Sequence, residues 1–346
     1  KRKRWQMARD SRDEICYNTP KQRMEHIRMK ITVLDGFLVN PGDISWEPIA
    51  GQGEFVLYEA TEPDEVIAHI GNAEAVFVNR CTIGAAAMDA CPDLRFINTF
   101  ATGFNMIDIA AAKERGITVC NVPAYSTHAV AQMAAALLLQ IACNTALFDH
   151  YVKTCGWVET ADRALTAIPH MELAGKTIGI IGLGDIGGNM ARIAQALGMQ
   201  VLAYRRHPDA ALENEHLHFV SLEELYARSD VISIHCPLND ESRGMIGEAA
   251  IARMRDGAIL INTARGAILD DAAVVRALNS GKLYAVGADV FAPEPCGKDH
   301  PLATHPRCVA TPHVGWAPRE TRERVIRYCA ENLAAWRTGK PQNRVV

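Results

Sequence analysis

Short runs of β-branched and other apolar residues alternate with amphipathic stretches along the chain from Met29 onward. Apolar runs of this length, each followed by a helical pattern, predict parallel strands joined by crossover helices. The first series of predicted strands is Ile31–Leu34, Phe55–Tyr58, Ala75–Val78, Phe96–Phe100 and Thr118–Val122. Between them, Pro63–Ile70 and Met106–Arg115 have the spacing of amphipathic helices.

A second series of strands follows a long apolar helix, predicted over Thr127–Lys153. Its runs are almost continuous in apolar residues, as is typical of strands covered on both faces. They are Thr177–Ile181, Gln200–Tyr204, Val231–His235, Ala258–Asn262, Ala285–Val290 and Cys308–Ala310. A last helix is predicted over Pro318–Arg337, where the proline suits a first helical turn. The pattern predicts an α/β protein of two Rossmann-like or flavodoxin-like parallel-sheet domains with a cleft between them.

The charge is unevenly distributed. Residues 1–28 carry nine Lys/Arg and four Asp/Glu, whereas the whole chain has a net charge of −4. The basic start could be a nucleic-acid or targeting patch. Because a well-formed strand pattern begins directly after it, we instead expect an appended N-terminal extension that is mobile rather than functional. The acidic remainder makes nucleic acid an unexpected partner.

Composition further limits the class of protein. No apolar run reaches the ~18 residues of a membrane span, so no membrane contact is expected. The ten cysteines form neither a C-x-x-C pair nor a Cys/His cluster. This scatter predicts reduced thiols, a cytoplasmic location and no metal site.

A glycine-rich turn, Gly182-Leu183-Gly184-Asp185-Ile186-Gly187, joins the strand that ends at Ile181 to a helix predicted over Asn189–Leu197. In the dinucleotide fingerprint the first glycine permits a tight turn, the second lets the backbone approach the pyrophosphate, and the third allows close packing of helix and strand. The helix N-terminus then offers free N–H groups to the phosphates. We therefore expect Gly182, Gly184 and Gly187 to bind a dinucleotide.

The end of the following strand bears on which dinucleotide is bound. A carboxylate at this point would bind the ribose hydroxyls, but the sequence reads Tyr204-Arg205-Arg206. Arginine can pair with a 2′-phosphate, so Arg205 and Arg206 favour NADP over NAD. NAD stays open, since either arginine could simply face the solvent.

Polar residues interrupt the apolar pattern after three later strands, at Arg265, Glu294 and His313. Ligands of parallel sheets bind outside the carboxyl ends of the strands. The planar fork of Arg265 suits a carboxylate and can polarise a ketone. His313 could give a proton to the developing alkoxide, and Glu294 could hold the imidazole and favour its charged form. The trio predicts hydride transfer between a nicotinamide cofactor and C2 of a small 2-keto or 2-hydroxy acid.

Together these segments resemble the D-isomer-specific 2-hydroxyacid dehydrogenase family over nearly all of Met29–Val346. The matching stretches are Gly182–Gly187, His235-Cys236-Pro237-Leu238, Asn262–Gly266, Asp289–Pro295 and Thr311–Gly315. The resemblance implies that Arg265, Glu294 and His313 are catalytic and that Asp289 holds the nicotinamide carboxamide. It also implies six further cofactor contacts, at Asp185, Ile186, Cys236, Pro237, Thr263 and Ala264.

Within the family, the front of the chain is similar to the glycerate dehydrogenase (hydroxypyruvate reductase) branch, in motifs such as Leu34-Asp35-Gly36 and Asn121–Thr127. The branch implies that the backbone of Ala101, Thr102 and Gly103 binds the substrate carboxylate, with help from Arg80. It also implies a substrate-binding domain of residues 29–126 and 316–346, and an NAD(P)-binding domain of residues 127–315. The apolar helix Thr127–Lys153 makes a homodimer expected.

Two departures from the family pattern leave alternatives open. The usual Asp at the nucleotide-specificity position is missing, and Val158–Pro169 matches poorly, which could alter substrate size selection or a dimer arm. D-lactate, glyoxylate or a longer 2-keto acid could be the substrate instead of hydroxypyruvate. The same fold also serves in dinucleotide-sensing co-repressors that bind short peptides, so a binding protein is the alternative of a different class.

Overall fold

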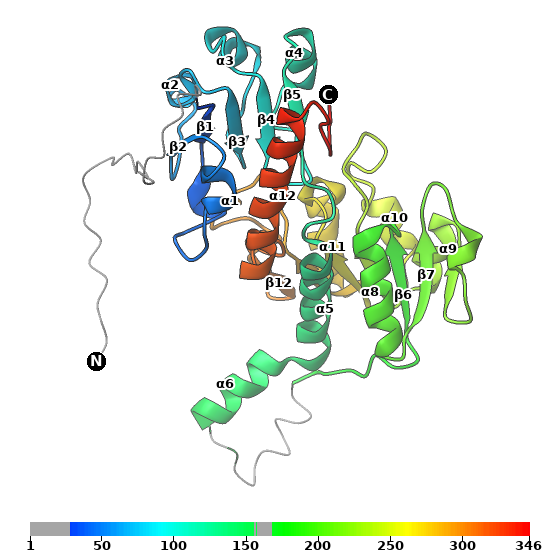
Figure 1. Ribbon diagram of the computed structural model, residues 1–346. Coiled ribbons are helices and arrows are strands. Elements are labelled where there is room, and N and C mark those ends of the chain that lie inside the picture. Colours follow the sequence, from blue (N-terminus) through cyan, green and yellow to red (C-terminus); the bar gives the residue numbers. More distant parts are fainter. Residues whose placement is uncertain (1–27, 156, 158–167) are drawn as a thin grey trace. The chain divides into compact units, whose positions relative to one another are not determined.

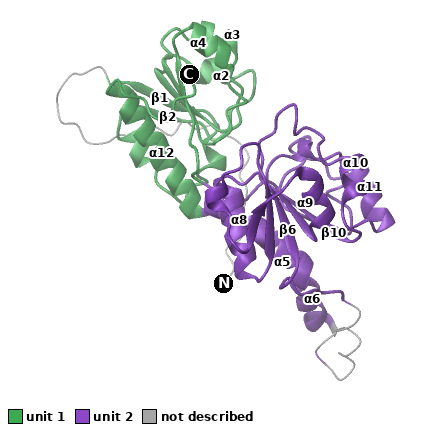
Figure 2. Ribbon diagram, turned by 90° about the vertical axis from the view of Figure 1, so that its right-hand side faces the viewer, with its two compact units in different colours: residues 1–125, 319–346 green, residues 126–318 purple. Residues whose placement is uncertain are grey.

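The computed structural model describes residues 28–155, 157 and 168–346 (Figure 1). The predicted N-terminal extension, apart from Arg28, and most of the poorly matched segment before Pro169 lie outside these residues. The chain divides into two compact units (Figure 2). Unit 1 consists of the chain up to Tyr125 together with Arg319–Val346, and unit 2 of Ser126–Pro318. The sequence placed these boundaries after residues 126 and 315.

Unit 1 contains a five-stranded parallel sheet in the order β2-β1-β3-β4-β5. The strands are β1 (Lys30–Val33), β2 (Glu54–Leu57), β3 (Ala75–Val78), β4 (Phe96–Thr99) and β5 (Thr118–Cys120). The five strands predicted here are therefore confirmed, with ends that agree to within two residues. Because all five are parallel, their carboxyl ends share one edge of the sheet.

The helices of unit 1 include one from the far end of the chain. They are η1 (Gly36–Leu38), α1 (Glu47–Ala50), α2 (Val66–Ile70), α3 (Ala85–Ala90), α4 (Ile109–Glu114) and α12 (Arg319–Arg337). In α12, Trp336 packs its ring 5.1 Å from that of Phe96 in β4. Asn332 of the same helix donates a 2.8 Å hydrogen bond to the buried Asn98. These contacts explain why the C-terminal helix completes the first unit (Figure 1).

Unit 2 contains a seven-stranded parallel sheet in the order β12-β11-β10-β9-β6-β7-β8. Its strands are β6 (Thr177–Ile181), β7 (Gln200–Tyr204), β8 (Leu217–Phe219), β9 (Val231–Ile234), β10 (Ala258–Asn262), β11 (Leu283–Ala288) and β12 (Cys308–Ala310). Six of these were predicted, and β8 was missed. This three-residue strand pairs only with β7 at the sheet edge, so it needs no long apolar run.

Helices cover both faces of this sheet. They are α5 (Thr127–Cys143), α6 (Thr145–Cys155), α8 (Asp185–Ala196), α9 (Leu222–Arg228), α10 (Glu248–Arg253) and α11 (Asp271–Ser280), with 3₁₀ turns η2 (Ala210–Leu212) and η3 (Gly266–Ile268). In β10, Ile259 and Ile261 join the core beneath α5 and α8, whereas Leu260 joins the core beneath α9 to α11. This two-sided burial is the physical reason for the almost continuous apolar runs.

The prediction of a single long helix over Thr127–Lys153 is wrong. Asn144 adopts a left-handed conformation (φ 49°, ψ 35°) that ends α5, and α6 begins at the next residue. Its side-chain amide also donates to the carbonyl of Pro169. Asparagine tolerates this conformation better than most residues, so it can end a helix where the apolar pattern continues. No single helix of the described residues has the length and apolar character to span a membrane, and α5 and α6 meet those criteria only as a pair bent by 53°.

Candidate active site

The glycine-rich segment Gly182–Gly187 directly follows β6, as predicted, but α8 begins at Asp185, four residues before the predicted helix start at Asn189. Gly182 has a φ of +95°, and a Cβ there would lie 2.6 Å from the amide nitrogen of Cys236. A Cβ on Gly187 would lie 2.2 Å from the carbonyl oxygen of Gly182. These two glycines are therefore required by the protein's own backbone, which approaches too closely for any side chain.

Gly184 differs, because a Cβ on it would meet no atom within 4 Å and its φ is negative. The residue precedes α8, which begins at Asp185 and has free N–H groups at its first turn. A glycine beside open space at a helix N-terminus fits the close approach of a phosphate. The turn thus fits a dinucleotide, whose pyrophosphate would occupy space that a side chain would fill.

Gly184→Ala is expected to raise the KM for the nicotinamide cofactor roughly tenfold, about 1.4 kcal/mol of binding energy, because its methyl group would occupy the phosphate's space. The thermal midpoint should stay unchanged, since no protein atom is nearby. Gly188→Ala is the matched control, because a Cβ there also meets nothing within 4 Å. Equal KM values for the two variants would contradict a phosphate contact at Gly184.

Arg265 lies in a tightly held loop after β10. The buried Asn262 accepts a 3.0 Å hydrogen bond from the amide of Ala264 and donates a 2.9 Å bond to the carbonyl of Arg265. A Cβ on Gly266 would lie 2.0 Å from the carbonyl carbon of Phe291, so this loop packs directly on the one after β11. The guanidinium of Arg265 is exposed and donates to the carbonyl of Ala264 at 2.7 Å. Sequence reasoning missed the supporting roles of Asn262 and Gly266.

Glu294 and His313 form a direct contact. His313 Nδ1 lies 2.6 Å from Glu294 Oε2, and the amide of Phe291 donates to Glu294 Oε1 at 3.0 Å. Both side chains are about one-third exposed. Burial tends to raise the pKa of Glu294, but the hydrogen bond and charge of His313, the Phe291 amide and the charge of Arg265 together hold that pKa below its ordinary value. The carboxylate is therefore ionised at neutral pH.

The arrangement leaves one of the two ring nitrogens of His313 available. Nδ1 of His313 is occupied by Glu294, and Nε2 forms no hydrogen bond within the described part of the chain. An imidazole held at Nδ1 by a carboxylate can hold a proton on Nε2 and deliver it to a substrate oxygen. The structure brings Arg265, Glu294 and His313 to the carboxyl edge of one sheet, at the ends of β10, β11 and β12.

Two buried polar atoms lie at the same edge without a partner. Thr263 Oγ1 and His235 Nδ1 form no hydrogen bond with the described residues, although both atoms are buried. They follow β10 and β9, which pair at Asn262 and Ile234, so they lie on neighbouring strand ends. Burial lowers the pKa of His235 to about 4, so its ring is neutral at pH 7. Because buried polar atoms are normally hydrogen-bonded, both atoms are available to a polar group of a ligand.

The remaining residues predicted to bind the cofactor lie after β9, β10 and β11 or in α8. Ala264 is half-buried in the loop of Arg265, and Cys236 and Pro237 follow His235. Ile186 is in the first turn of α8. Asp289 is only 1% exposed and is bonded to the loop that carries His313.

The two arginines after β7 have different surroundings. Arg206 forms an exposed ion pair with Glu241, a carboxylate that sequence reasoning did not connect with this position. Arg205 is partly buried, and its side chain forms no hydrogen bond or ion pair with the described residues. Of the two, Arg205 is therefore the one whose charge is not already matched by a carboxylate.

The predicted substrate residues lie in unit 1, at the ends of neighbouring strands. Arg80 follows β3, and Ala101, Thr102 and Gly103 follow β4, with which β3 pairs. Val122 holds this second loop, because its amide donates to the carbonyl of Ala101 and its carbonyl accepts from the hydroxyl of Thr102, both at 2.9 Å. The side-chain amide of Asn121 also donates to the carbonyl of Thr102 at 2.7 Å, so the loop is fixed by its neighbours.

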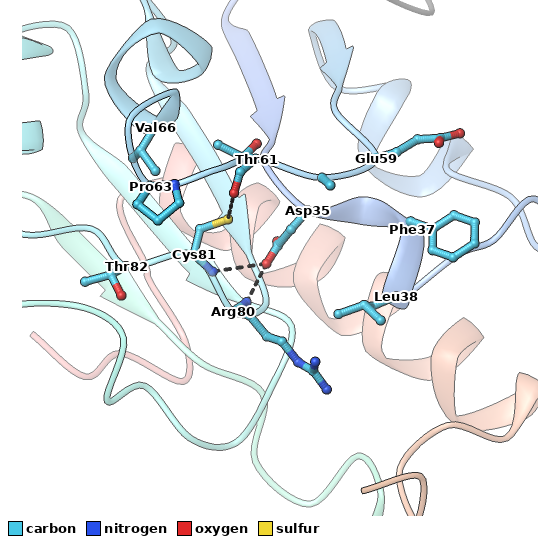
Figure 3. Close-up of a pocket in the computed structure, with 11 residues that line it drawn as sticks. Asp35, Phe37, Leu38, Glu59, Thr61, Pro63, Val66, Arg80, Cys81 and Thr82 are labelled. Atoms are coloured by element: carbon cyan, nitrogen blue, oxygen red, sulfur yellow. Dashed lines mark hydrogen bonds between the residues drawn. The ribbon is translucent and has the colours of Figure 1, made fainter. Parts of the chain in front are cut away.

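Arg80 also lines a pocket of about 800 Å³ at the carboxyl ends of β1, β2 and β3 (Figure 3). The buried Asp35 accepts hydrogen bonds from the amides of Asn79 (2.7 Å), Arg80 and Cys81 (3.1 Å), which fixes the backbone of this loop. In Figure 3 the guanidinium of Arg80 extends away from Asp35, and it bonds to no described residue. Arg80 is thus a cation on a fixed backbone with no partner in the described part of the chain, a feature that suits an anionic ligand.

Comparisons with known proteins agree with this geometry. Residues 135–315 match the model of the D-isomer specific 2-hydroxyacid dehydrogenase, NAD binding domain. The chain is 43% identical to a hydroxypyruvate reductase from Blautia hydrogenotrophica over 91% of its own length and 99% of that protein. It is 36% identical to a glycerate dehydrogenase from Methylorubrum extorquens, over 84% of this chain and 91% of that one.

A solved structure gives the same result for the fold. The TT0316 protein from Thermus thermophilus superposes with a TM-score of 0.80 at 34% identity, covering 92% of this chain and 100% of that one. The matches extend over both units. The chain therefore belongs to the D-isomer specific 2-hydroxyacid dehydrogenase family and is a nicotinamide-dependent oxidoreductase acting on the CH–OH group of 2-hydroxy acids.

Proposed function

We propose that this chain is a hydroxypyruvate reductase, acting in the opposite direction as a D-glycerate dehydrogenase. The observation that carries the proposal is the 2.6 Å contact between His313 and Glu294 beside the charge of Arg265. Relatives of similar length that are named hydroxypyruvate reductase and glycerate dehydrogenase support this choice of substrate. A nicotinamide cofactor would supply the hydride that adds to C2.

The three side chains have separate roles in this proposal. Arg265 binds the substrate carboxylate in two-point fashion and polarises the C2 carbonyl. His313 gives the proton on Nε2 to the carbonyl oxygen as the hydride arrives, and takes it back when the hydroxy acid is oxidised. Glu294 orients the ring through Nδ1 and stabilises its cationic form.

We further propose that the cofactor is bound by unit 2 and that residues of unit 1 contribute to substrate binding. The glycine turn, Thr263 and Asp289 of unit 2 would bind the dinucleotide, which agrees with the match of residues 135–315 to an NAD binding domain. In unit 1, the backbone of Ala101–Gly103 would bind the carboxylate, with Arg80 nearby as a second cation. These assignments retain the domain roles expected from the sequence.

The test is a steady-state screen of the isolated protein with hydroxypyruvate, glyoxylate, pyruvate and a longer 2-keto acid, each with NADH and NADPH. The highest kcat/KM is expected for hydroxypyruvate, and D-glycerate rather than its L-isomer should be oxidised. A higher kcat/KM for glyoxylate or pyruvate would replace the proposed substrate by a sister activity. No cofactor oxidation with any of them would contradict the enzymatic role itself.

The choice between the two cofactors depends on Arg205, which supports a preference for NADP. Arg205→Ala is expected to raise the KM for NADPH roughly tenfold and to leave the KM for NADH unchanged, because only NADPH carries the 2′-phosphate. Arg206→Ala is the matched control, with a smaller effect, since Glu241 already pairs with that guanidinium. Equal increases for both cofactors in Arg205→Ala would mean that Arg205 does not contact the 2′-phosphate.

We also propose a homodimer in the cytoplasm. Exposed apolar side chains on α5 and α6, among them Leu139, Leu147 and Val152, support a self-association surface. Light scattering should give twice the chain mass of 37.8 kDa, and a monomer at micromolar concentration would contradict the proposal. The eight free cysteines found among the described residues agree with a reducing compartment.

A further inference from the structure

The carboxylate of Asp289 is bonded to the segment that carries His313. Its Oδ1 accepts hydrogen bonds from the hydroxyl of Thr311 at 2.6 Å and from the amide of Val314 at 2.9 Å. Its Oδ2 accepts from the amide of Gly315 at 2.8 Å. The three donors thus come from both sides of His313, and Asp289 is only 1% exposed.

This segment needs to be held, because its backbone is not in a relaxed conformation. His313 has a φ of +55°, in the left-handed region that a residue with a Cβ rarely adopts. Such a conformation persists only where surrounding contacts impose it. The contact of the ring with Glu294 fixes the side chain, whereas Asp289 bonds to the backbone just after His313 and to the side chain of Thr311 just before it.

The segment that carries His313 also packs closely against Met133 of α5. A Cβ on Gly315 would lie 3.0 Å from Asp289 Oδ2 and 3.4 Å from the Cβ of Met133. The hydroxyl of Thr311 also lies 3.9 Å from the sulfur of Met133. The segment is therefore packed between α5 and Asp289. A buried carboxylate is stable only when donors satisfy it, so it and the three donors stabilise one another.

We propose that Asp289 is a positioning residue for His313: through Thr311, Val314 and Gly315 it holds the backbone that aims the imidazole at the reacting ketone. This role is separate from the contact with the nicotinamide carboxamide that the family resemblance implies. A carboxylate can accept about four hydrogen bonds, so three bonds to the segment leave room for one to a ligand. The catalytic readouts below rest on the proposed function, but the exchange readout does not.

Positioning of His313 and binding of the cofactor predict different kinetics. A variant of Thr311 can separate the two roles, because the Thr311 hydroxyl bonds to Asp289 and belongs to the segment that carries His313. Thr311→Val keeps the shape and removes the donor, and it should lower kcat roughly tenfold while the KM for NADPH changes less than about twofold. Thr311→Ser should restore kcat, since it keeps the hydroxyl. Thr304→Val, which removes a surface hydroxyl bonded to the carbonyl of His300, is the control and should behave as the unchanged protein.

Asp289→Asn tests the hydrogen bonds between Asp289 and the segment without relying on activity. An amide group keeps one acceptor oxygen but turns the other position into a donor, so it faces either Gly315 or the Thr311–Val314 pair with an N–H group. Hydrogen exchange at the amides of Val314 and Gly315 should become at least roughly tenfold faster, while exchange in β10 stays the same.

Three results would overturn the proposal. One is unchanged exchange at both amides in Asp289→Asn. The second is a raised KM for NADPH with kcat retained in Thr311→Val, which would leave Asp289 with a cofactor role alone. The third is an equal loss of kcat in Thr311→Val and Thr304→Val. An unchanged protein that reduces no 2-keto acid would instead contradict the proposed function, and the exchange result would still decide the role of Asp289.

Discussion

His313→Ala is expected to lower kcat for 2-keto acid reduction by a factor on the order of 10²–10⁴, the usual contribution of a positioned proton donor. The physical reason is that Nε2 has no partner among the described residues, whereas Nδ1 is held by Glu294 at 2.6 Å. Without the ring, the developing alkoxide must take its proton from water. Initial rates of nicotinamide cofactor oxidation with saturating hydroxypyruvate measure the effect.

The control for this variant is His216→Ala, because His216 is a surface residue that interacts with the neighbouring Glu215. It should leave kcat unchanged. Cofactor binding to His313→Ala, measured by the quenching of tryptophan fluorescence, should resemble that of the unchanged protein, which would exclude misfolding. If kcat stays within about threefold while cofactor binding weakens, His313 is not the proton donor.

The positions of most strands along the chain could be predicted from the sequence because most strands are buried on two faces. In β10 every residue is buried, so the apolar run coincides with the strand from Ala258 to Asn262. This regularity also identified the polar residues that follow strands, including Arg265 and His313. Where burial is one-sided or the element is short, as in β8, the pattern carries little information.

The break at Asn144 escaped prediction for a different reason. The apolar pattern continues from α5 into α6, and a left-handed residue changes the direction of the chain without changing that pattern. An asparagine in an otherwise helical run was the available signal, since it is one of the few residues that commonly end helices in this conformation. Its bond to the carbonyl of Pro169, 25 residues later, was not visible in the sequence.

In the candidate site, the sequence identified side chains with chemistry but not those that support them. Asp35 lies more than 40 residues before the loop that it holds, and Arg206 lies 35 residues before its partner Glu241. Contacts at such separations depend on the strand order, which apolar runs do not specify. The local support by Asn262 could have been found, because Asn commonly bonds to backbone two or three residues ahead.

Glu294→Gln is expected to lower kcat at neutral pH about tenfold to a hundredfold, the effect of replacing a charged hydrogen-bond partner of His313 by a neutral one. It should also displace the pH profile. The pKa of Glu294 is lowered, so its carboxylate is negative throughout the working range and favours a proton on His313. Glutamine can still accept from Nδ1 but carries no charge. Reduction, which needs the protonated ring, should then fall off at a lower pH than in the unchanged enzyme.

Glu241→Gln is the control, because it removes a carboxylate that pairs with Arg206 on the surface and should leave the pH profile unchanged.

The stability of the fold gives a second measurement. Since the pKa of Glu294 is lower in the folded state than in the unfolded chain, its stabilising contribution is complete above the ordinary carboxyl range and is lost as the pH falls through the lowered value. The Gln variant should therefore lose less stability on acidification. A pH profile that does not move in Glu294→Gln would show that the charge of Glu294 does not act on the proton donor.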